Sequence, residues 1–439
     1  MKQSKHNIYY SPKEVRTILE RSINTALDGL KCYCNDPVSD FTRCRKLPAR
    51  TLIECIMSFS NYSSIGELSH FFVGQGEMPS ASALSQRRQL LDPDIFKRIN
   101  NLFVGAFDDH TTINGYHILA QDGSDVNIPF MDDKTKTEKH DAKSFCQYHV
   151  NALYDCLNKV FYDWSIDAAS KKREVNALIS ILKDRNYPQN SIFTADRGYE
   201  SYNLMAHFIE NDIKFVIRVK DIHTKSGLMT NIRTEEGVFD MRVTRTLTSL
   251  QTKEIKADKE KYIFVPSTSN FDFLDETRDF YDLSFRAVRF KISEDTYETV
   301  VTNLSEEEFK TEDFKELYHY RWNEETAFNK LKYAIGLVYF HARNRKLIQQ
   351  EINAAFLMYN VSEVIIRNID LKKKKKLKYD YKINFSSAVT NIRLYLRKKL
   401  KTKELIIRIK KFLVPRRPER SFERNMKSQS CKSLNYRTS

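Results

Sequence analysis

The alternation of strand-like and helix-like segments between residues 116 and 220 constrains the fold more than any other feature of this sequence. The runs YHILAQD, HVNALYD and VFYDWSID have the composition of strands, and the last two are close enough to form a hairpin. The segments REVNALISILKDR, SIFTAD, NLMAHFIEND and KFVIRVK then alternate between helical and strand periodicity. Three adjacent strands followed by strand–helix units predict an α/β fold, with a mixed sheet and helices packed on it.

The segments on either side of this block have other periodicities. A first helix is predicted after Ser11, because Ser11 and Glu14 form a capping box. Alternating apolar and polar side chains after residue 220 predict strands, and helical spacing returns near Ser305. We therefore expect a helical N-terminal region (1–112), the first part of a core (113–220), a β-rich insertion (221–296), a helical completion of the core (297–370) and a basic helical C-terminal region (371–439).

Positive charge is concentrated at the end of the chain. The net charge is +15, but residues 371–439 contain 23 Lys and Arg against 4 Asp and Glu, so this segment carries +19 and the remainder −4. Blocks such as LKKKKKLKY and VPRRPERSF are typical of segments that bind polyanions, nucleic acid above all. A solvated basic tail is the plain alternative, although such tails often hold phosphates as well.

Several functional classes are disfavoured by composition. The chain has only 11 glycines, which argues against a Gly-rich phosphate loop. It has no run of 18 apolar residues and no apolar N-terminal segment, so we expect neither a membrane span nor secretion. The seven cysteines lack paired C-x-x-C spacing, which indicates reduced thiols in a cytosolic protein and leaves a zinc cluster as a minor alternative.

Two short helical runs in the N-terminal region suggest a DNA contact. IGELSHFF and SASALSQRRQLL are joined by the turn-rich connector VGQGEMP. A helix–turn–helix with Arg87 and Arg88 on its second helix can read DNA, but a purely structural helical hairpin has the same pattern. We expect the N-terminal region to bind DNA ends.

Three carboxylates have positions that favour metal chemistry. Asp122 and Asp196 each end a predicted strand at a polar turn, where α/β sheets place their active sites, and Glu325 lies on a helix after the insertion. Such a set can hold two Mg²⁺ or Mn²⁺ ions, which can activate a water and stabilise a leaving oxygen at a phosphodiester. A single strand-end aspartate is more often a turn residue. The competing carboxylates nearby are Asp125, Asp155 and Asp163.

The stretch YHYRWNEETAFNKLKYAIG is predicted to be helical and places four functional groups together. Tyr318, Arg321, Glu325 and Lys332 lie at offsets of 0, 3, 7 and 14, within about 60° of arc on a helix. A solvated, salt-bridged face is the plain explanation. A carboxylate flanked by a guanidinium, an ammonium and a phenol also suits a phosphate substrate.

Three motifs, in order, give the sequence a family resemblance. The signature Y-x2-R-x3-E-x6-K of Tyr318, Arg321, Glu325 and Lys332, together with QDGSDV and ADRGYES, resembles that of bacterial insertion-sequence transposases of the DDE type. The resemblance covers about residues 40–425, and VPRRPERSF is similar to the family's basic C-terminal segment.

The resemblance implies an RNase H-like core with a β-rich insertion between the second aspartate and the glutamate, which are 129 residues apart. It implies that Asp122, Asp196 and Glu325 are the catalytic residues and hold two Mg²⁺ (or Mn²⁺) ions. Phosphates of the transposon end would then be held by Tyr318, Arg321 and Lys332. The further basic residues expected to contact DNA are Arg87, Arg88, Arg416, Arg417 and Arg420.

The activity implied is cleavage and strand transfer of transposon ends. The expected partners are double-stranded DNA, as terminal inverted repeats and as target, and a second copy of the chain in a synaptic complex. The expected location is the bacterial cytoplasm, at the nucleoid. Two alternatives remain open: an RNase H-like nuclease that does not rejoin DNA, and a catalytically silent DNA-binding descendant.

The tryptophans depart from the family pattern. Some relatives flip a base with a tryptophan of the insertion, but here Trp164 and Trp322 both lie outside it. We expect Trp322 to pack in the core, with base contact as the alternative. The aromatic residues of the insertion that could substitute are Phe264, Phe271, Phe273, Phe280, Tyr281 and Phe285.

Overall fold

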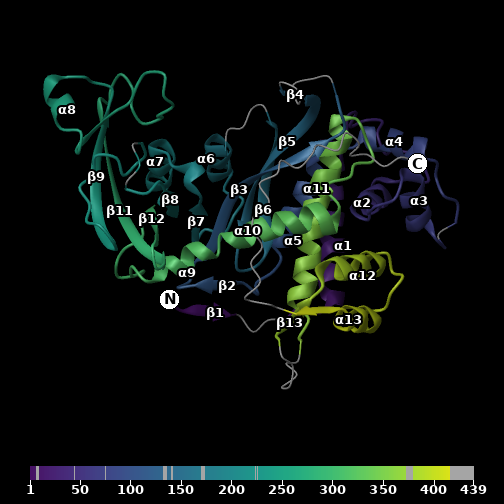
Figure 1. Ribbon diagram of the computed structural model, residues 1–439. Helices are drawn as coiled ribbons and strands as arrows, with labels where there is room; N and C mark the ends of the chain where they lie inside the picture. The colour runs from purple at the N-terminus through teal and green to yellow at the C-terminus, as the bar shows by residue number, and fades with distance from the viewer. Residues whose placement is uncertain are drawn as a thin grey trace.

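The computed structural model places a large mixed sheet beside a helical bundle (Figure 1). The residues that it describes are 1–5, 9–43, 45–74, 76–131, 136–139, 142–169, 174–222, 224, 226–371 and 379–415. Within this part of the chain, no helix is long and apolar enough to cross a membrane.

The core of the sheet is built from the strands expected between residues 116 and 220. They are β3 (His117–Ile128), β5 (Ala142–Asp155), β6 (Val160–Ala168), β7 (Ser191–Ala195) and β8 (Lys214–Val219). β5 pairs antiparallel with both β3 and β6, whereas β3, β7 and β8 are parallel neighbours. The order β6-β5-β3-β7-β8 and these directions form the mixed α/β sheet that the sequence predicts.

The strands after residue 220 extend this same sheet, and the last of them lies almost wholly beyond the expected insertion (221–296), in the segment expected to complete the core with helices (297–370). β12 (Thr296–Thr302) pairs antiparallel with β8, and the sheet then continues through β11 (Phe280–Ser293), β9 (Phe239–Thr248) and β10 (Tyr262–Phe264). A short β4 (Lys136–Lys139) pairs with β5 beyond the other side of the core. Pairing of β12 with β8 gives the edge of the core a partner and makes ten strands one continuous sheet.

Helices cover both faces of the sheet. α6 (Glu174–Asp184) and α7 (Tyr202–Glu210) connect the parallel strands, and a short α8 (Lys253–Ala257) lies in the insertion. α9 (Asp313–His319) and α10 (Trp322–Lys330) cross in front of the sheet in Figure 1.

The long helix α11 (Arg345–Arg367) joins the sheet to the bundle. It packs on β6, where the Trp164 ring stacks on Phe356 with 4.4 Å between ring centroids, and the Trp164 indole donates to Asn353 over 2.7 Å. The buried Asn353 side chain of α11 therefore has a partner on β6.

The N-terminal region is helical, as expected. The helices are α1 (Pro12–Asp28), the 3₁₀ helix η1 (Leu30–Tyr33), α2 (Ala49–Met57), α3 (Ser64–Phe72), α4 (Ala81–Leu90) and α5 (Asp94–Val104). The capping box at the start of α1 is present: Glu14 donates its backbone N–H to Ser11 Oγ and accepts the Ser11 N–H. α1, α2, α4 and α5 all contact α11, which makes α11 the common axis of the bundle.

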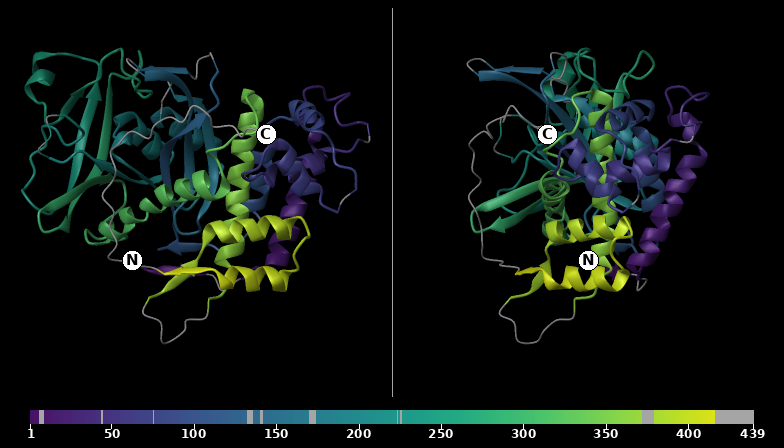
Figure 2. Two further views of the ribbon diagram at one scale, coloured as in Figure 1. Left: turned by 45° about the vertical axis from the view of Figure 1, so that its right-hand side comes forward. Right: turned by 90° about the vertical axis from the view of Figure 1, so that its right-hand side faces the viewer.

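Two short strand pairs lie near the beginning and the end of the described part of the chain. β1 (Gln3–Lys5) pairs with β2 (Thr111–Ile113), just before the core begins. β13 (Tyr381–Ile383) pairs with β14 (Leu413–Pro415), and between them α12 (Phe385–Leu396) and α13 (Thr402–Lys411) form a hairpin at the base of α11 (Figure 2).

Arg88 does not occupy the position expected of a DNA contact. Its side chain is 3% exposed and donates to Leu347 O (2.7 Å), Glu351 Oε1 (2.8 Å) and Gln350 Oε1 (3.2 Å), all on α11. Burial alone would raise the pKa of Glu351, but Arg88 and His341 lower it to about 2. The expectation that Arg88 binds phosphate does not fit this burial, because the guanidinium holds α4 on α11.

This pairing gives a stability prediction. We expect Arg88→Ala to lower the free energy of unfolding by about 3–5 kcal/mol, because it leaves the buried Glu351 carboxylate without its main counter-charge. The neighbouring Arg87→Ala removes a partly exposed hydrogen bond to Leu47 O and a contact with the Phe41 ring, but no buried ion pair, and should cost about 1–2 kcal/mol. Urea denaturation of the two variants measures the difference, and equal losses would contradict the assignment.

Candidate active site

Asp122 and Asp196 are neighbours because of the register of two parallel strands. Gln121 of β3 pairs with Ala195, the last residue of β7, so the next residue along each strand is an aspartate. Asp196 caps the 3₁₀ helix η3 (Arg197–Tyr199) by accepting the Gly198 N–H over 2.8 Å. The predicted convergence of the two aspartates is therefore a direct consequence of sheet topology.

Asp122 does not end its strand, contrary to the expectation from its sequence. β3 continues through Asp122 to Ile128, and Gly123 pairs with Asn151 of β5. A Cβ atom on Gly123 would lie 2.3 Å from His149 Nε2. Gly123 therefore makes room for a neighbouring imidazole and does not form a turn.

Glu325 reaches the aspartates through Arg321. α9 ends at His319 and α10 begins at Trp322, so the single helix expected from the sequence is interrupted by one tightened turn at Tyr320 and Arg321. The Arg321 guanidinium lies 3.6 Å from Asp122 Oδ2 and 3.3 Å from Glu325 Oε1, and is 3% exposed. A buried cation thus bridges the sheet carboxylate and the helix carboxylate.

The charges of all three carboxylates act on Arg321, and those of Asp196 and Glu325 act on Asp122. Burial raises the pKa of Asp122 to about 6; the Gly123 N–H and Arg321 oppose the rise, and the charges of Asp196 and Glu325 add to it. Burial lowers the pKa of Arg321, but Tyr318 and the three carboxylates outweigh burial and raise it. Arg321 therefore stays charged at the centre of a group of acids.

These residues fit a divalent cation in their chemistry. Three carboxylates supply the hard oxygen ligands that Mg²⁺ and Mn²⁺ prefer, and a cation would relieve the repulsion that raises the pKa of Asp122. With the side chains as they stand, no cluster of three or more His, Cys, Asp or Glu in the described ranges is close enough to hold a metal. Asp122 and Glu325 are instead each paired with Arg321.

Tyr318 and Lys332 lie in different surroundings. Tyr318 is 1% exposed, its hydroxyl has no hydrogen-bond partner among the described residues, and burial raises its pKa to about 12. Lys332 lies in a π-helical turn, η4 (Leu331–Ile335), which departs from the 100° spacing assumed for the helical stripe. Burial lowers the pKa of Lys332, and its charged neighbour Asp125 opposes this.

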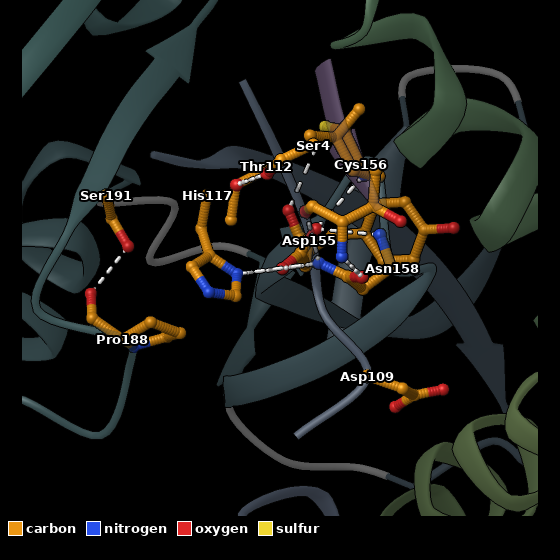
Figure 3. Close-up of polar contacts among 12 residues, drawn as sticks. Ser4, Asp109, Thr112, His117, Asp155, Cys156, Asn158, Pro188 and Ser191 are labelled. Carbon is orange, nitrogen blue, oxygen red and sulfur yellow. Dashed lines mark hydrogen bonds and ion pairs between the residues drawn. The ribbon is translucent and has the colours of Figure 1, made fainter. Parts of the chain in front are cut away.

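Each competing carboxylate has another partner. Asp155 is buried and binds His117 Nδ1 over 2.7 Å and Asn158 Nδ2 over 2.9 Å (Figure 3). Asp163 pairs with Lys97 over 3.2 Å, and Asp125 accepts a hydrogen bond from His149. These contacts give Asp155 and Asp163 partners outside the group around Arg321, whereas Asp125 also acts on Lys332.

Glu324 belongs to the site but was missed by the sequence interpretation. It is fully buried, and neither carboxyl oxygen has a hydrogen-bond partner in the part of the chain that the structure describes. Burial raises its pKa well above the usual range, and Asp122 adds to the rise. Beside Glu325, a second glutamate on a charged helix resembles a solvated residue, so sequence gives no signal of its burial.

The expectation that Trp322 packs in the core is wrong. Its side chain is 40% exposed, and the Arg321 guanidinium lies 4.9 Å from its ring centroid. Of the insertion aromatics, Tyr281 and Phe285 are buried and Phe271 and Phe273 are partly buried, whereas Phe264 and Phe280 are more than two-fifths exposed.

Comparison with known proteins identifies the family. Residues 113–361 match the model of the transposase DDE domain, and the match covers more than half of the chain, so the chain belongs to this family. Transposases of this type generally use divalent metal ions.

Two further comparisons add little. A piggyBac transposase synaptic complex with hairpin DNA matches over 96% of this chain and 90% of its own, with 11% identity and a TM-score of 0.41. No curated protein matches the chain.

The raised pKa of Asp122 predicts a pH-dependent cost of the site. Because the folded-state pKa lies near 6 and the ordinary value is 3.8, Asp122 stabilises the fold while it is protonated, and this contribution is lost as the pH rises through 6. Asp122→Asn should therefore raise the free energy of unfolding at pH 8 by about 1–3 kcal/mol, and by much less at pH 4.5. Urea titrations measure both, with exposed Asp295→Asn as control; an equal effect at both pH values would contradict the prediction.

Proposed function

We propose that this chain is a DNA transposase that cleaves insertion-sequence ends and joins them to target DNA. The observation that carries the proposal is the convergence of Asp122, Asp196 and Glu325 around Arg321 within the transposase DDE domain. Its finer parts are the assignment to the insertion-sequence family with the Y-x2-R-x3-E-x6-K signature and action at the bacterial nucleoid.

The three carboxylates would hold two Mg²⁺ (or Mn²⁺) ions. When bound, such ions activate an attacking water or hydroxyl and stabilise the leaving oxygen of a phosphodiester. Arg321 then presents its fork to a phosphate of the transposon end. Its Nε and the Tyr318 hydroxyl have no hydrogen-bond partners among the described residues, which supports a role for both in binding an acceptor-rich ligand. Lys332 adds a positive charge.

Further DNA contacts are proposed for basic residues that are partly or fully exposed. Arg87, with Arg45 and Lys46, lines a groove beside the start of α4 and is proposed to contact a terminal repeat. The exposed basic residues of α13, Lys403, Arg408 and Lys410, extend the positive surface at the other end of the bundle. Arg416, Arg417 and Arg420 lie outside the described residues and stay a prediction.

Trp322 is the proposed aromatic contact for a DNA base. It lies next to the phosphate-binding Arg321, is exposed, and presents a ring on which a base can stack. Two copies of the chain are proposed to hold the two transposon ends in one synaptic complex, with the region 1–112 binding ends and 371–439 contributing DNA or dimer contacts.

The carboxylate assignment has a direct test. Asp122→Asn, Asp196→Asn and Glu325→Gln should each lower the rate of Mg²⁺-dependent cleavage by at least about 1,000-fold, while binding of a labelled terminal repeat stays within about threefold. The matched controls are Asp295→Asn and Glu294→Gln, both exposed in the β11–β12 turn. Retained cleavage in any of the three variants would remove that residue from the catalytic set.

The same assay separates the alternatives. Incubation of the wild-type protein with Mg²⁺, a labelled terminal repeat and supercoiled target should give joined product. Cleaved ends without joining would identify a nuclease, and end binding without cleavage a silent descendant.

Salt dependence tests the phosphate contacts. Each lost contact should reduce the slope of log K against log salt by about 1, so Lys332→Ala and Arg87→Ala should each do so, and the double variant by about 2. Fluorescence anisotropy with a terminal repeat, at salt concentrations between about 50 and 300 mM, measures the slope. A slope unchanged in Lys332→Ala would place this residue away from DNA.

A further inference from the structure

His149 contacts two carboxylates near the three proposed metal ligands, and the proposed reaction does not use it. It is 2% exposed in the middle of β5. Its Nδ1 lies 2.7 Å from Asp125 Oδ1 on β3, and its Nε2 lies 3.0 Å from Glu174 Oε1 at the start of α6. One ring therefore links two strands and the helix that covers them.

The ring also supports the peptide that orients Asp122. Besides the approach of Nε2, a Cβ on Gly123 would lie 2.6 Å from His149 Cε1, so the imidazole packs directly against the Gly123 backbone. The Gly123 N–H donates to Asp122 Oδ1 over 2.8 Å. Any shift of the ring would therefore be transmitted to the hydrogen bond that fixes the Asp122 carboxylate.

The other end of the contact leads to Asp196. Glu174 Oε2 would lie 3.5 Å from a Cβ on Gly198, and the Gly198 N–H donates to Asp196 Oδ1 over 2.8 Å. Each aspartate thus accepts the N–H of a glycine. His149 packs on Gly123, and Glu174, its partner, lies on the side of Gly198 where a Cβ would be. Burial would lower the pKa of His149, but the two carboxylates of Asp125 and Glu174 raise it to about 9.

We propose that His149 is a positioning residue that sets the placement of Asp122 beside Asp196 by packing on Gly123, with Glu174 holding the other side of the ring. This positioning role rests on the proposed function, since Asp122 and Asp196 are the residues that would bind the cations. His149 itself touches neither substrate nor metal. Second-layer contacts of this kind commonly change metal affinity by 10–100-fold.

The chain supplies a matched control. His117 of β3 is also buried and also pairs with an aspartate, Asp155, over 2.7 Å (Figure 3). Neither His117 nor Asp155 is among the nearest neighbours of a Cβ on Gly123 or Gly198. A purely structural histidine should behave like His117. A positioning histidine should differ from it in metal affinity and cleavage, not in stability.

The experiment compares His149→Gln, His149→Phe and His117→Gln in the full chain. We expect similar losses in melting temperature for the two histidines. Only the His149 variants should weaken Mn²⁺ binding, followed by paramagnetic resonance without DNA, by about 10–100-fold. Their cleavage rate at saturating DNA should fall in parallel, with terminal-repeat binding unchanged. Glu174→Gln, which leaves His149 in place, provides a second variant if His149→Phe does not fold, and should weaken Mn²⁺ binding in the same direction.

The outcomes are distinguishable. Wild-type Mn²⁺ affinity in both His149→Gln and Glu174→Gln, or a loss no larger than in His117→Gln, would overturn the positioning role and leave the proposed transposase intact. A wild-type protein that binds no Mn²⁺ and cleaves no ends would overturn both.

Discussion

The placement of one guanidinium among three carboxylates is the interaction on which the site depends. Asp122, Asp196 and Glu325 repel one another, and burial adds to the cost of keeping them charged. Arg321 offsets that cost from the junction of α9 and α10, so helix and sheet must dock closely for the carboxylates to coexist. The same cation occupies the space between two proposed metal ligands, which makes metal loading and the position of Arg321 interdependent.

A second buried network holds the helical bundle to the core. Four polar side chains of α11 are buried, and each bonds to another element: Gln350, Glu351, Asn353 and Asn360. Unpaired buried polar groups are costly, so these contacts fix how the bundle sits on β6. The two networks have different residues. One holds the bundle on the sheet, and the other places a buried guanidinium among carboxylates that repel one another.

Local patterns predicted the elements well and their environments less well. The strands from 116 to 220 and the capping box at Ser11 follow from short-range periodicity and side-chain chemistry. The insertion strands were also expected, but their pairing with β8 was not, because a strand pattern does not say which edge it joins. Gly123 looked like a turn residue because only tertiary contact with His149 shows why glycine stands there. Arg88 and Trp322 were assigned opposite burials to those observed, since charge and aromaticity alone do not report exposure.

By itself, the sequence determined the strands and helices of the core, the basic C-terminal segment and the motifs from which Asp122, Asp196 and Glu325 are predicted to be the catalytic residues. Those properties are local, or are carried by motifs that match a family. Only the tertiary structure decided that Asp122 lies within a strand, that Glu324 is buried beside it, that Arg321 bridges Asp122 and Glu325, and that His149 lies behind the peptide of Gly123. These depend on contacts between residues far apart in the chain, and burial and charge pairing arise only when the sheet and helices pack together.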